Sequence, residues 1–105
     1  MLDVIESNFE EIVLKSELPV LVDFYGVWCP PCRQIAPVLE RLATEYAGTC
    51  KIVKVNHDEN TSLSERYNLT ALPTLMFFQN GQVVKTIQGA QPESVLRETI
   101  ESLRA

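Results

Sequence analysis

An apolar segment that runs directly into two cysteines at the start of a helix constrains the fold more than any other feature. Residues 19–25 form a nearly continuous apolar run, which is typical of a strand buried on both faces of a sheet. Cys29 and Cys32 follow this run, and apolar side chains then recur at helical spacing from Ile35 to Tyr46. A strand buried on both faces needs helices above and below it, so this unit predicts an α/β protein.

The remaining segments add further strands and helices to this unit. Ser7 and Glu10 have the spacing of a capping box, which predicts a helix that extends to about Leu14. The Asn80-Gly81 pair between two apolar segments predicts a β-hairpin. Strands are expected at residues 51–56, 74–79 and 82–87, with a short strand near Val4, and helices at residues 61–67 and from Pro92 onward.

This order of elements predicts a mixed central β-sheet of four to five strands, flanked by four helices. The first strands alternate with helices and therefore run parallel, whereas the closing hairpin adds antiparallel strands at an edge. No repeat or linker interrupts the pattern, so residues 1–105 are expected to form a single domain.

The composition argues against several classes of function. The formal net charge of −5 disfavours nucleic acid or an anionic membrane as the main partner. Three cysteines are too few for the disulfide framework of a small secreted protein, and the acidic residues among the first 18 are unlike a signal peptide. The expected location is therefore the reducing cytoplasm, or an organelle if the chain is a mature form.

The two closely spaced cysteines predict thiol–disulfide chemistry. At a helix start they lie one turn apart, and the unpaired N–H groups there favour a thiolate. A structural disulfide and half of a metal site are the alternatives, although a bridge that closes so short a loop adds little stability. We expect an exposed, ionised Cys29 to attack a disulfide and a more buried Cys32 to resolve the mixed disulfide.

Asp23 interrupts the apolar strand that precedes the cysteines, where an unpaired carboxylate is costly. Burial is expected to raise its pKa, and an acid poised near Cys32 can take and return the proton of that thiol. Lys54, in the next strand, is a candidate partner that limits this rise. The alternatives are a strand-end carboxylate that reaches solvent and a lysine whose amine extends to the surface.

Two other features stand near the predicted site. Trp28 can shield the cysteines and contact a protein substrate, or it can simply pack against its neighbours. Leu72-Pro73 directly precedes a strand, and a cis bond there would leave backbone groups free to pair with an extended substrate. The tripeptide with Thr74 does not by itself distinguish cis from trans, and most bonds before proline are trans.

Cys50 and the only histidine, His57, allow a different interpretation. Together with Cys29 and Cys32 they contain the ligands of a Cys3His zinc site, although the spacing matches no familiar zinc finger. A small, half-buried thiol at the start of a strand and a histidine in a loop are the simpler interpretations of these two residues.

The chain resembles the thioredoxin family over essentially its whole length. The resemblance lies in the following segments: Val22-Asp23-Phe24, Trp28 to Cys32, Pro37, Lys54-Val55-Asn56, Leu72-Pro73-Thr74, Asn80-Gly81 and Gly89-Ala90. It implies the thioredoxin fold and a protein-disulfide reductase whose redox centre is the Cys29-Cys32 disulfide, with no other bound cofactor and no metal.

The resemblance also implies roles for individual residues. Cys29 corresponds to the family's nucleophile, Cys32 to its resolving thiol, Asp23 to its buried proton carrier and Lys54 to the neighbour of that carrier. Pro73 corresponds to the family's cis proline. The expected substrate-docking residues are Trp28, Pro30, Pro31, Leu72, Pro73, Gly89 and Ala90.

The expected partners follow from the chemistry and from the resemblance. No redox-cofactor motif is visible, so electrons must come from a partner, and the family implies a thioredoxin reductase that is NADPH- or ferredoxin-linked. The substrates are expected to be protein disulfides and the chain a monomer. A binding module with an incidental dithiol and a zinc or iron–sulfur carrier are the competing functions.

The sequence departs from the usual family pattern next to the cysteines. Pro30 replaces a glycine, Tyr25 a tryptophan and Gly26 an alanine, while Arg33 keeps the charge of a common lysine. Because proline has no backbone N–H, Pro30 removes one potential hydrogen-bond donor near the Cys29 sulfur.

Overall fold

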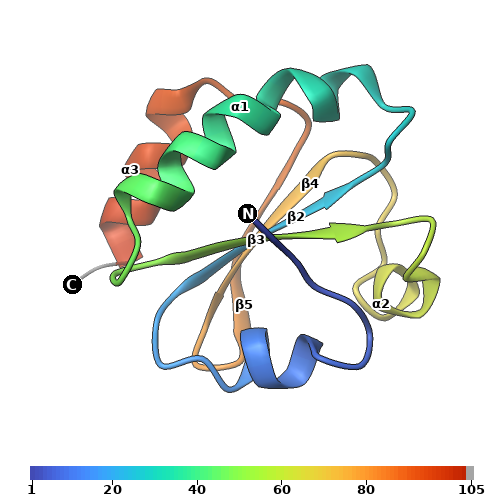
Figure 1. Cartoon of the computed structure of the whole chain (residues 1–105), viewed down its shortest axis with the longest axis horizontal. Coiled ribbons are helices and arrows are strands. Elements are labelled where there is room, and N and C mark those ends of the chain that lie inside the picture. The colour runs from blue at the N-terminus through green and yellow to red at the C-terminus, as the bar shows by residue number, and fades with distance from the viewer. Residues whose placement is uncertain (104–105) are drawn as a thin grey trace.

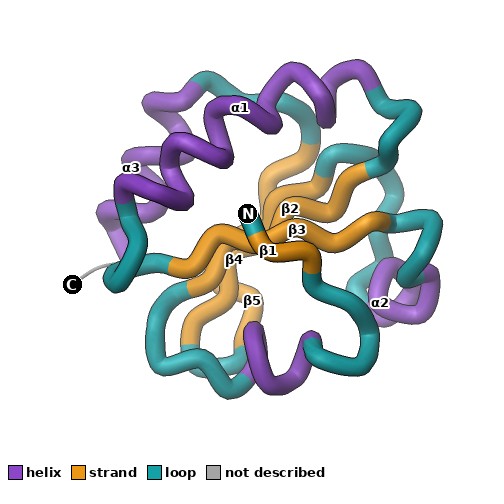
Figure 2. The backbone as a smooth tube through the Cα atoms, in the orientation of Figure 1, coloured by secondary structure: helices purple, strands orange, loops and turns teal. Residues whose placement is uncertain are grey.

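A computed structural model describes residues 1–103 of the chain and shows a mixed sheet covered by helices on both faces (Figures 1 and 2). Within these residues the five strands lie in the order β1-β3-β2-β4-β5. The strands are β1 (Leu2–Asp3), β2 (Val20–Tyr25), β3 (Lys51–Asn56), β4 (Thr74–Gln79) and β5 (Gln82–Gln88). The helices are η1 (Glu10–Leu14), α1 (Pro30–Glu45), α2 (Thr61–Arg66) and α3 (Glu93–Leu103).

The strand directions confirm the predicted mixed sheet. Strands β1, β3 and β2 run parallel, whereas β4 is antiparallel to β2 and β5 is antiparallel to β4. Asn80 and Gly81 have φ values of 54° and 80°, as a tight two-residue hairpin requires. A side chain at Gly81 would place Cβ 3.0 Å from the Leu14 carbonyl oxygen, so this turn packs closely against η1.

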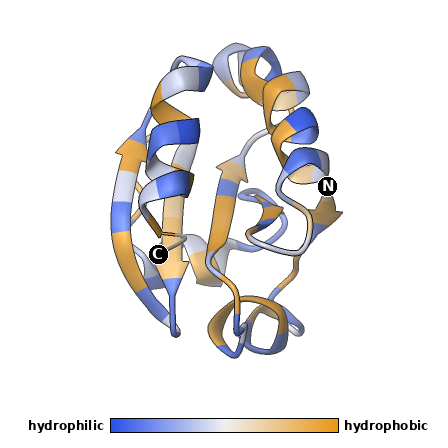
Figure 3. Cartoon of the chain, turned by 90° about the vertical axis from the view of Figure 1, so that its left-hand side faces the viewer, coloured by the Kyte–Doolittle hydropathy of each residue, from blue (hydrophilic) through white to orange (hydrophobic). Residues whose placement is uncertain are grey.

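Alternate residues of the central strands fill two separate cores. Val20, Val22 and Phe24 of β2 face η1 and α2, whereas Leu21 faces α1 and α3. Figure 1 shows these helix pairs on opposite sides of the sheet. The two long helices combine hydrophilic and hydrophobic residues along their length (Figure 3), because each buries one side and exposes the other.

The first helix differs from its prediction. The expected capping box at Ser7 is wrong: the Asn8 side chain accepts a hydrogen bond from the Ile5 N–H, and no side chain caps the following helix. That helix is a single wide turn, η1, closed by a bond from the Lys15 N–H to the Glu10 carbonyl oxygen. Phe9, just before this turn, and Val13 within it are both 1% exposed and pack in the core on this side of the sheet.

The register of β2 gathers distant segments at one end of the sheet. Phe24 pairs with Thr74, so the Leu72-Pro73 peptide lies beside the end of β2 that leads to the cysteines. Tyr25 pairs with Asn56 of β3, and the His57 N–H donates to the Tyr25 carbonyl oxygen at 2.8 Å. Three segments far apart in sequence therefore meet around the start of α1.

Candidate active site

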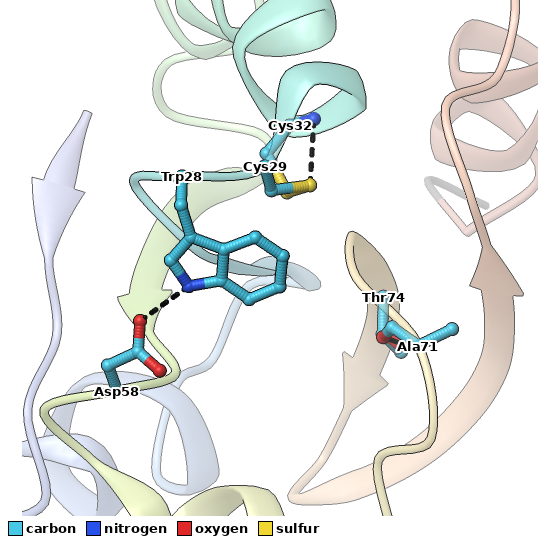
Figure 4. The surroundings of a disulfide bond; sticks show 6 residues. All are labelled: Trp28, Cys29, Cys32, Asp58, Ala71 and Thr74. Atoms are coloured by element: carbon cyan, nitrogen blue, oxygen red, sulfur yellow. Dashed lines mark hydrogen bonds between the residues drawn. A yellow bond between two sulfur atoms is a disulfide. The ribbon is translucent and has the colours of Figure 1, made fainter.

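Cys29 and Cys32 form a disulfide at the first turn of α1, with their Cα atoms 5.3 Å apart (Figure 4). Cys29 is the N-cap residue, and its Sγ accepts a hydrogen bond from the Cys32 N–H at 3.3 Å. Pro30 and Pro31 have no N–H, so Cys32 supplies the first backbone donor inside this helix. The N-terminus of α1 therefore presents the partial positive charge of its backbone N–H groups to the Cys29 sulfur.

The predicted difference in exposure between the two cysteines is wrong for this oxidised form. Cys29 is 2% exposed and Cys32 is 4% exposed. The Cys29 sulfur is held against the first turn of α1 by the disulfide and by the Cys32 N–H, so the N-cap position does not expose it. The neighbouring residues Pro30 and Pro31 are the exposed part of this turn.

Asp23 lies beneath the disulfide in the middle of the sheet. Its side chain is on the α1 face of β2, and it lines a cavity of about 290 Å³ together with Cys32. The residue is 3% exposed, and its Oδ1 atom has no hydrogen-bond partner among residues 1–103. Burial raises the pKa of Asp23 from 3.8 to about 7, and the charge of Lys54 limits the rise.

The Lys54 amine has a partner that the sequence did not predict. Lys54 is the register neighbour of Asp23, but its Nζ forms an ion pair with Asp3 Oδ2 at 3.8 Å. It also lies 5.5 Å from the centre of the Tyr25 ring. The expected influence of Lys54 on Asp23 is therefore present as an electrostatic effect, while its direct contacts go to β1 and β2.

Trp28 lies on the surface beside the disulfide and is 61% exposed (Figure 4). Its indole N–H donates to Asp58 Oδ2 at 2.8 Å, and it lines a pocket of about 240 Å³ with His57 and Leu72. A Cβ at Gly26, two residues before Trp28, would lie 3.0 Å from the indole, so the close approach of this ring favours glycine there. The sequence did not predict Asp58 as part of the site, because Trp28 and Asp58 become neighbours only when β2 and β3 pair in this register.

The loop before β4 lies near Trp28 and contributes to the same surface around the disulfide. The Leu72–Pro73 peptide bond is cis, as the family resemblance implies. The Pro73 carbonyl oxygen accepts a hydrogen bond from the Gly89 N–H at 2.8 Å, which places Gly89 and the exposed Ala90 next to this loop. The structure thus gathers the residues expected to dock a substrate around one end of the sheet.

The alternative zinc site is not assembled. Cys50 is 2% exposed and packs in the core between the sheet and α1, while the His57 Nδ1 lies 2.8 Å from Ser64 Oγ. Within residues 1–103, no group of three or more His, Cys, Asp and Glu side chains is placed to hold a metal ion.

Comparisons with known proteins agree with this geometry. The family model described as Thioredoxin matches residues 1–102. The chain belongs to the thioredoxin family. It is 47% identical over 98 residues to Thioredoxin 1 of Nostoc sp., covering 93% of this chain and 92% of that protein. It is 52% identical over 94 residues to the thioredoxin of Streptomyces clavuligerus, covering 90% of this chain and 87% of that protein.

Membership of the thioredoxin family establishes the activity. The chain is a thiol–disulfide oxidoreductase that reduces protein disulfides, with the Cys29-Cys32 pair as its redox centre. A partner reductase returns the disulfide to the dithiol. The relatives include the chloroplastic M-type thioredoxin of Spinacia oleracea, which is 46% identical over 99 residues, or 94% of this chain and 55% of that protein. Among the described residues, no helix combines the length and apolar character needed to cross a membrane.

The raised pKa of Asp23 predicts that this carboxyl destabilises the fold as the pH rises. Between pH 4 and pH 7 the folded chain keeps a proton that the unfolded chain has lost, so stability falls with increasing pH in this window. From pH 5 to pH 8 the oxidised parent should lose about 2 to 3 kcal/mol more unfolding free energy than the Asp23→Asn variant. Urea unfolding at both pH values measures this difference.

The matched control is Glu98→Gln, which changes an exposed carboxylate on α3. It should follow the pH dependence of the parent. Equal pH dependence of the parent and Asp23→Asn would contradict the raised pKa.

Proposed function

We propose that Cys29 is the attacking thiol, Cys32 the resolving thiol and Asp23 the group that carries the proton of Cys32. The observation that carries this assignment is the buried Asp23 carboxyl, which lines one cavity with Cys32 and has a pKa of about 7. A group with this pKa is present in both protonation states near neutral pH, so it can both take and return a proton.

The first half of the reaction is an attack on the substrate. The Cys29 thiolate attacks one sulfur of a protein disulfide, a bond forms between Cys29 Sγ and that sulfur, and the substrate disulfide breaks. The second substrate sulfur leaves as a thiolate and takes a proton from solvent. The thiolate of Cys29 is favoured by its N-cap position and by the Cys32 N–H.

The second half releases the reduced substrate. The Asp23 carboxylate takes the proton of Cys32, whose thiolate then attacks Cys29 Sγ. The bond between the two proteins breaks as the Cys29-Cys32 disulfide forms, and the departing substrate thiolate receives a proton from Asp23 or from solvent. The substrate gains two electrons from the cysteine pair and two protons, of which one balances the proton that Cys32 loses and the other comes from solvent.

We further propose that an extended segment of the substrate docks across the disulfide. Trp28, Pro30, Pro31 and Ala90 supply exposed side chains, and Leu72 lines the pocket beside Trp28. The cis Pro73 and its hydrogen-bonded neighbour Gly89 supply the backbone next to it. In this arrangement Trp28 provides apolar contact area and the loop before β4 provides hydrogen-bonding groups.

We infer that the electron donor is a thioredoxin reductase, either NADPH- or ferredoxin-linked, and that residues 1–105 act as a single monomeric domain. The similarity to bacterial and chloroplastic thioredoxins supports a location in the cytoplasm, or in an organelle if the chain is a mature form. Insulin reduction coupled in turn to each kind of reductase identifies the donor.

The roles of the two thiols predict different behaviour of their serine variants. Cys32→Ser should accumulate a mixed disulfide through Cys29, because the attack proceeds and the resolution does not. Cys29→Ser should form none through the active site and should lose insulin reduction at least a thousandfold. Mass spectrometry of peptides from the trapped complex identifies the linked cysteine.

Cys50→Ser is the matched control, since this buried thiol takes no part in the mechanism. It should keep the parent rate. If Cys29→Ser retains the parent rate, the chain acts as a binding module and the mechanism is wrong.

The role of Asp23 predicts a defect confined to the second step. In Asp23→Asn the attack by Cys29 should keep its rate within about twofold, while resolution by Cys32 near pH 7 should slow by about 10 to 100 times because no base takes its proton. Stopped-flow measurement of both phases separates the steps. Equal rates of resolution in the variant and the parent would remove Asp23 from the mechanism.

A further inference from the structure

One row of side chains across the sheet alternates in charge. Asp3 of β1 pairs with Lys54 of β3, and Lys54 pairs with Asp23 of β2. Residues paired in neighbouring parallel strands place their side chains on the same face, so the row Asp3, Lys54, Asp23 lies on the α1 face of the sheet. The lysine therefore stands between an exposed carboxylate and a buried one.

The ion pair of Lys54 is with the carboxylate at the exposed end of this row. Its Nζ is 3.8 Å from Asp3 Oδ2 and 5.5 Å from the centre of the Tyr25 ring. The Tyr25 hydroxyl donates to Asp3 Oδ1 at 3.0 Å and so fixes the carboxylate that holds the amine. At the other end, Asp23 Oδ1 receives no hydrogen bond from any residue between 1 and 103.

Tyr25 is well suited to this arrangement. Its partial burial, followed by the hydrogen bond to Asp3, raises the pKa of its hydroxyl to about 12, so it remains a donor throughout the neutral range. Its ring also attracts the Lys54 amine through a cation–π contact. The ring and hydroxyl of one residue therefore hold both members of the ion pair.

We propose that Asp3 is a positioning residue for disulfide exchange: with Tyr25 it holds the Lys54 amine in an ion pair at the exposed end of the row, so that the amine does not pair with the buried Asp23 carboxyl. This inference rests on the proposed role of Asp23 as proton carrier. Asp3 lies at the sheet edge and acts on the cysteine pair through Asp23, chiefly by way of the Lys54 amine.

The sign of the effect follows from the charges. A free Lys54 amine would favour the Asp23 carboxylate and lower its pKa, and the Asp3 carboxylate opposes this by binding the amine. Asp3 also disfavours a second negative charge in the same row. Removal of its charge should therefore lower the pKa of Asp23 by both routes.

Other charged groups surround the same cavity and must stay unchanged in the test. Besides Tyr25 and Lys54, the cavity is lined by Arg33 and Glu40 of α1, by Cys32 and by Met1, whose amino group contacts Glu40. Asp3→Asn alters none of these groups. The asparagine side chain retains an oxygen that accepts from the Tyr25 hydroxyl, so the substitution removes charge with little change of shape.

The test is a titration of the Asp23 carboxyl carbon by NMR in oxidised Asp3→Asn and in the parent. We expect the proton affinity of Asp23 to fall by about threefold to tenfold in the variant. The control variant Glu98→Gln removes an exposed charge on α3 and should leave the titration unchanged. An unchanged midpoint in Asp3→Asn would overturn the proposal.

A second pair of proteins tests whether Asp3 acts through Lys54. In a Lys54→Met background, Asp3→Asn should shift the Asp23 midpoint by less than half as much as in the parent background. A shift of undiminished size would show that Asp3 acts directly and would overturn the positioning role.

The kinetic consequence separates this proposal from the proposed function. The pH profile of mixed-disulfide resolution should move to lower pH in Asp3→Asn, together with the Asp23 titration. If the titration moves and resolution does not, the role of Asp23 as proton carrier fails while the electrostatic coupling of Asp3 stands. If resolution depends on Asp23 and neither quantity moves in Asp3→Asn, the proposal about Asp3 fails alone.

Discussion

The site depends on the register of β2, the central strand between β3 and β4. Its parallel pairing with β3 sets Lys54 beside Asp23, and its antiparallel pairing with β4 sets Thr74 beside Phe24. A shift of one residue would turn Asp23 to the opposite face of the sheet, away from Cys32. The same shift would also exchange the side chains of the two cores, moving Phe24 to the α1 face and Leu21 to the opposite face.

The same register buries an ionisable side chain, Asp23, at the centre of the molecule, and this reduces the stability of the fold. Asp23 lies on the α1 face of β2, two residues after Leu21. Leu21 contributes an apolar side chain to the core on that face, whereas Asp23 places a carboxyl there. A buried carboxyl with one oxygen that has no hydrogen-bond partner among residues 1–103 weakens the fold whenever it is ionised. We interpret this loss of stability as a consequence of function, because the same burial raises the pKa of Asp23 to about 7, where it can exchange a proton with Cys32.

Patterns within single segments predicted much of this structure. The apolar run of β2, the helical spacing of α1 and the Asn80-Gly81 turn each express local preferences of the chain, so the mixed sheet followed from them. The burial of Asp23 was also predictable, because its immediate neighbours are apolar.

Features that join distant segments were not predictable from the sequence. The ion pair of Asp3 with Lys54 and the hydrogen bond of Trp28 to Asp58 depend on how strands are aligned, which no local pattern specifies. The cis form of the bond before Pro73 was implied by family resemblance and not by its neighbours. The burial of Cys29 was predicted incorrectly because capping position alone does not determine side-chain exposure.

Burial at the middle of the sheet gives Asp23 a proton affinity suited to exchange with Cys32. The most direct test is the pH titration of the Asp23 side-chain carboxyl by carbon NMR in the oxidised parent protein. We expect a midpoint of about 7, well above the ordinary value of 3.8. A midpoint close to that ordinary value would show that the carboxylate is solvated or paired at neutral pH, and would remove burial as the origin of a proton-carrying Asp23.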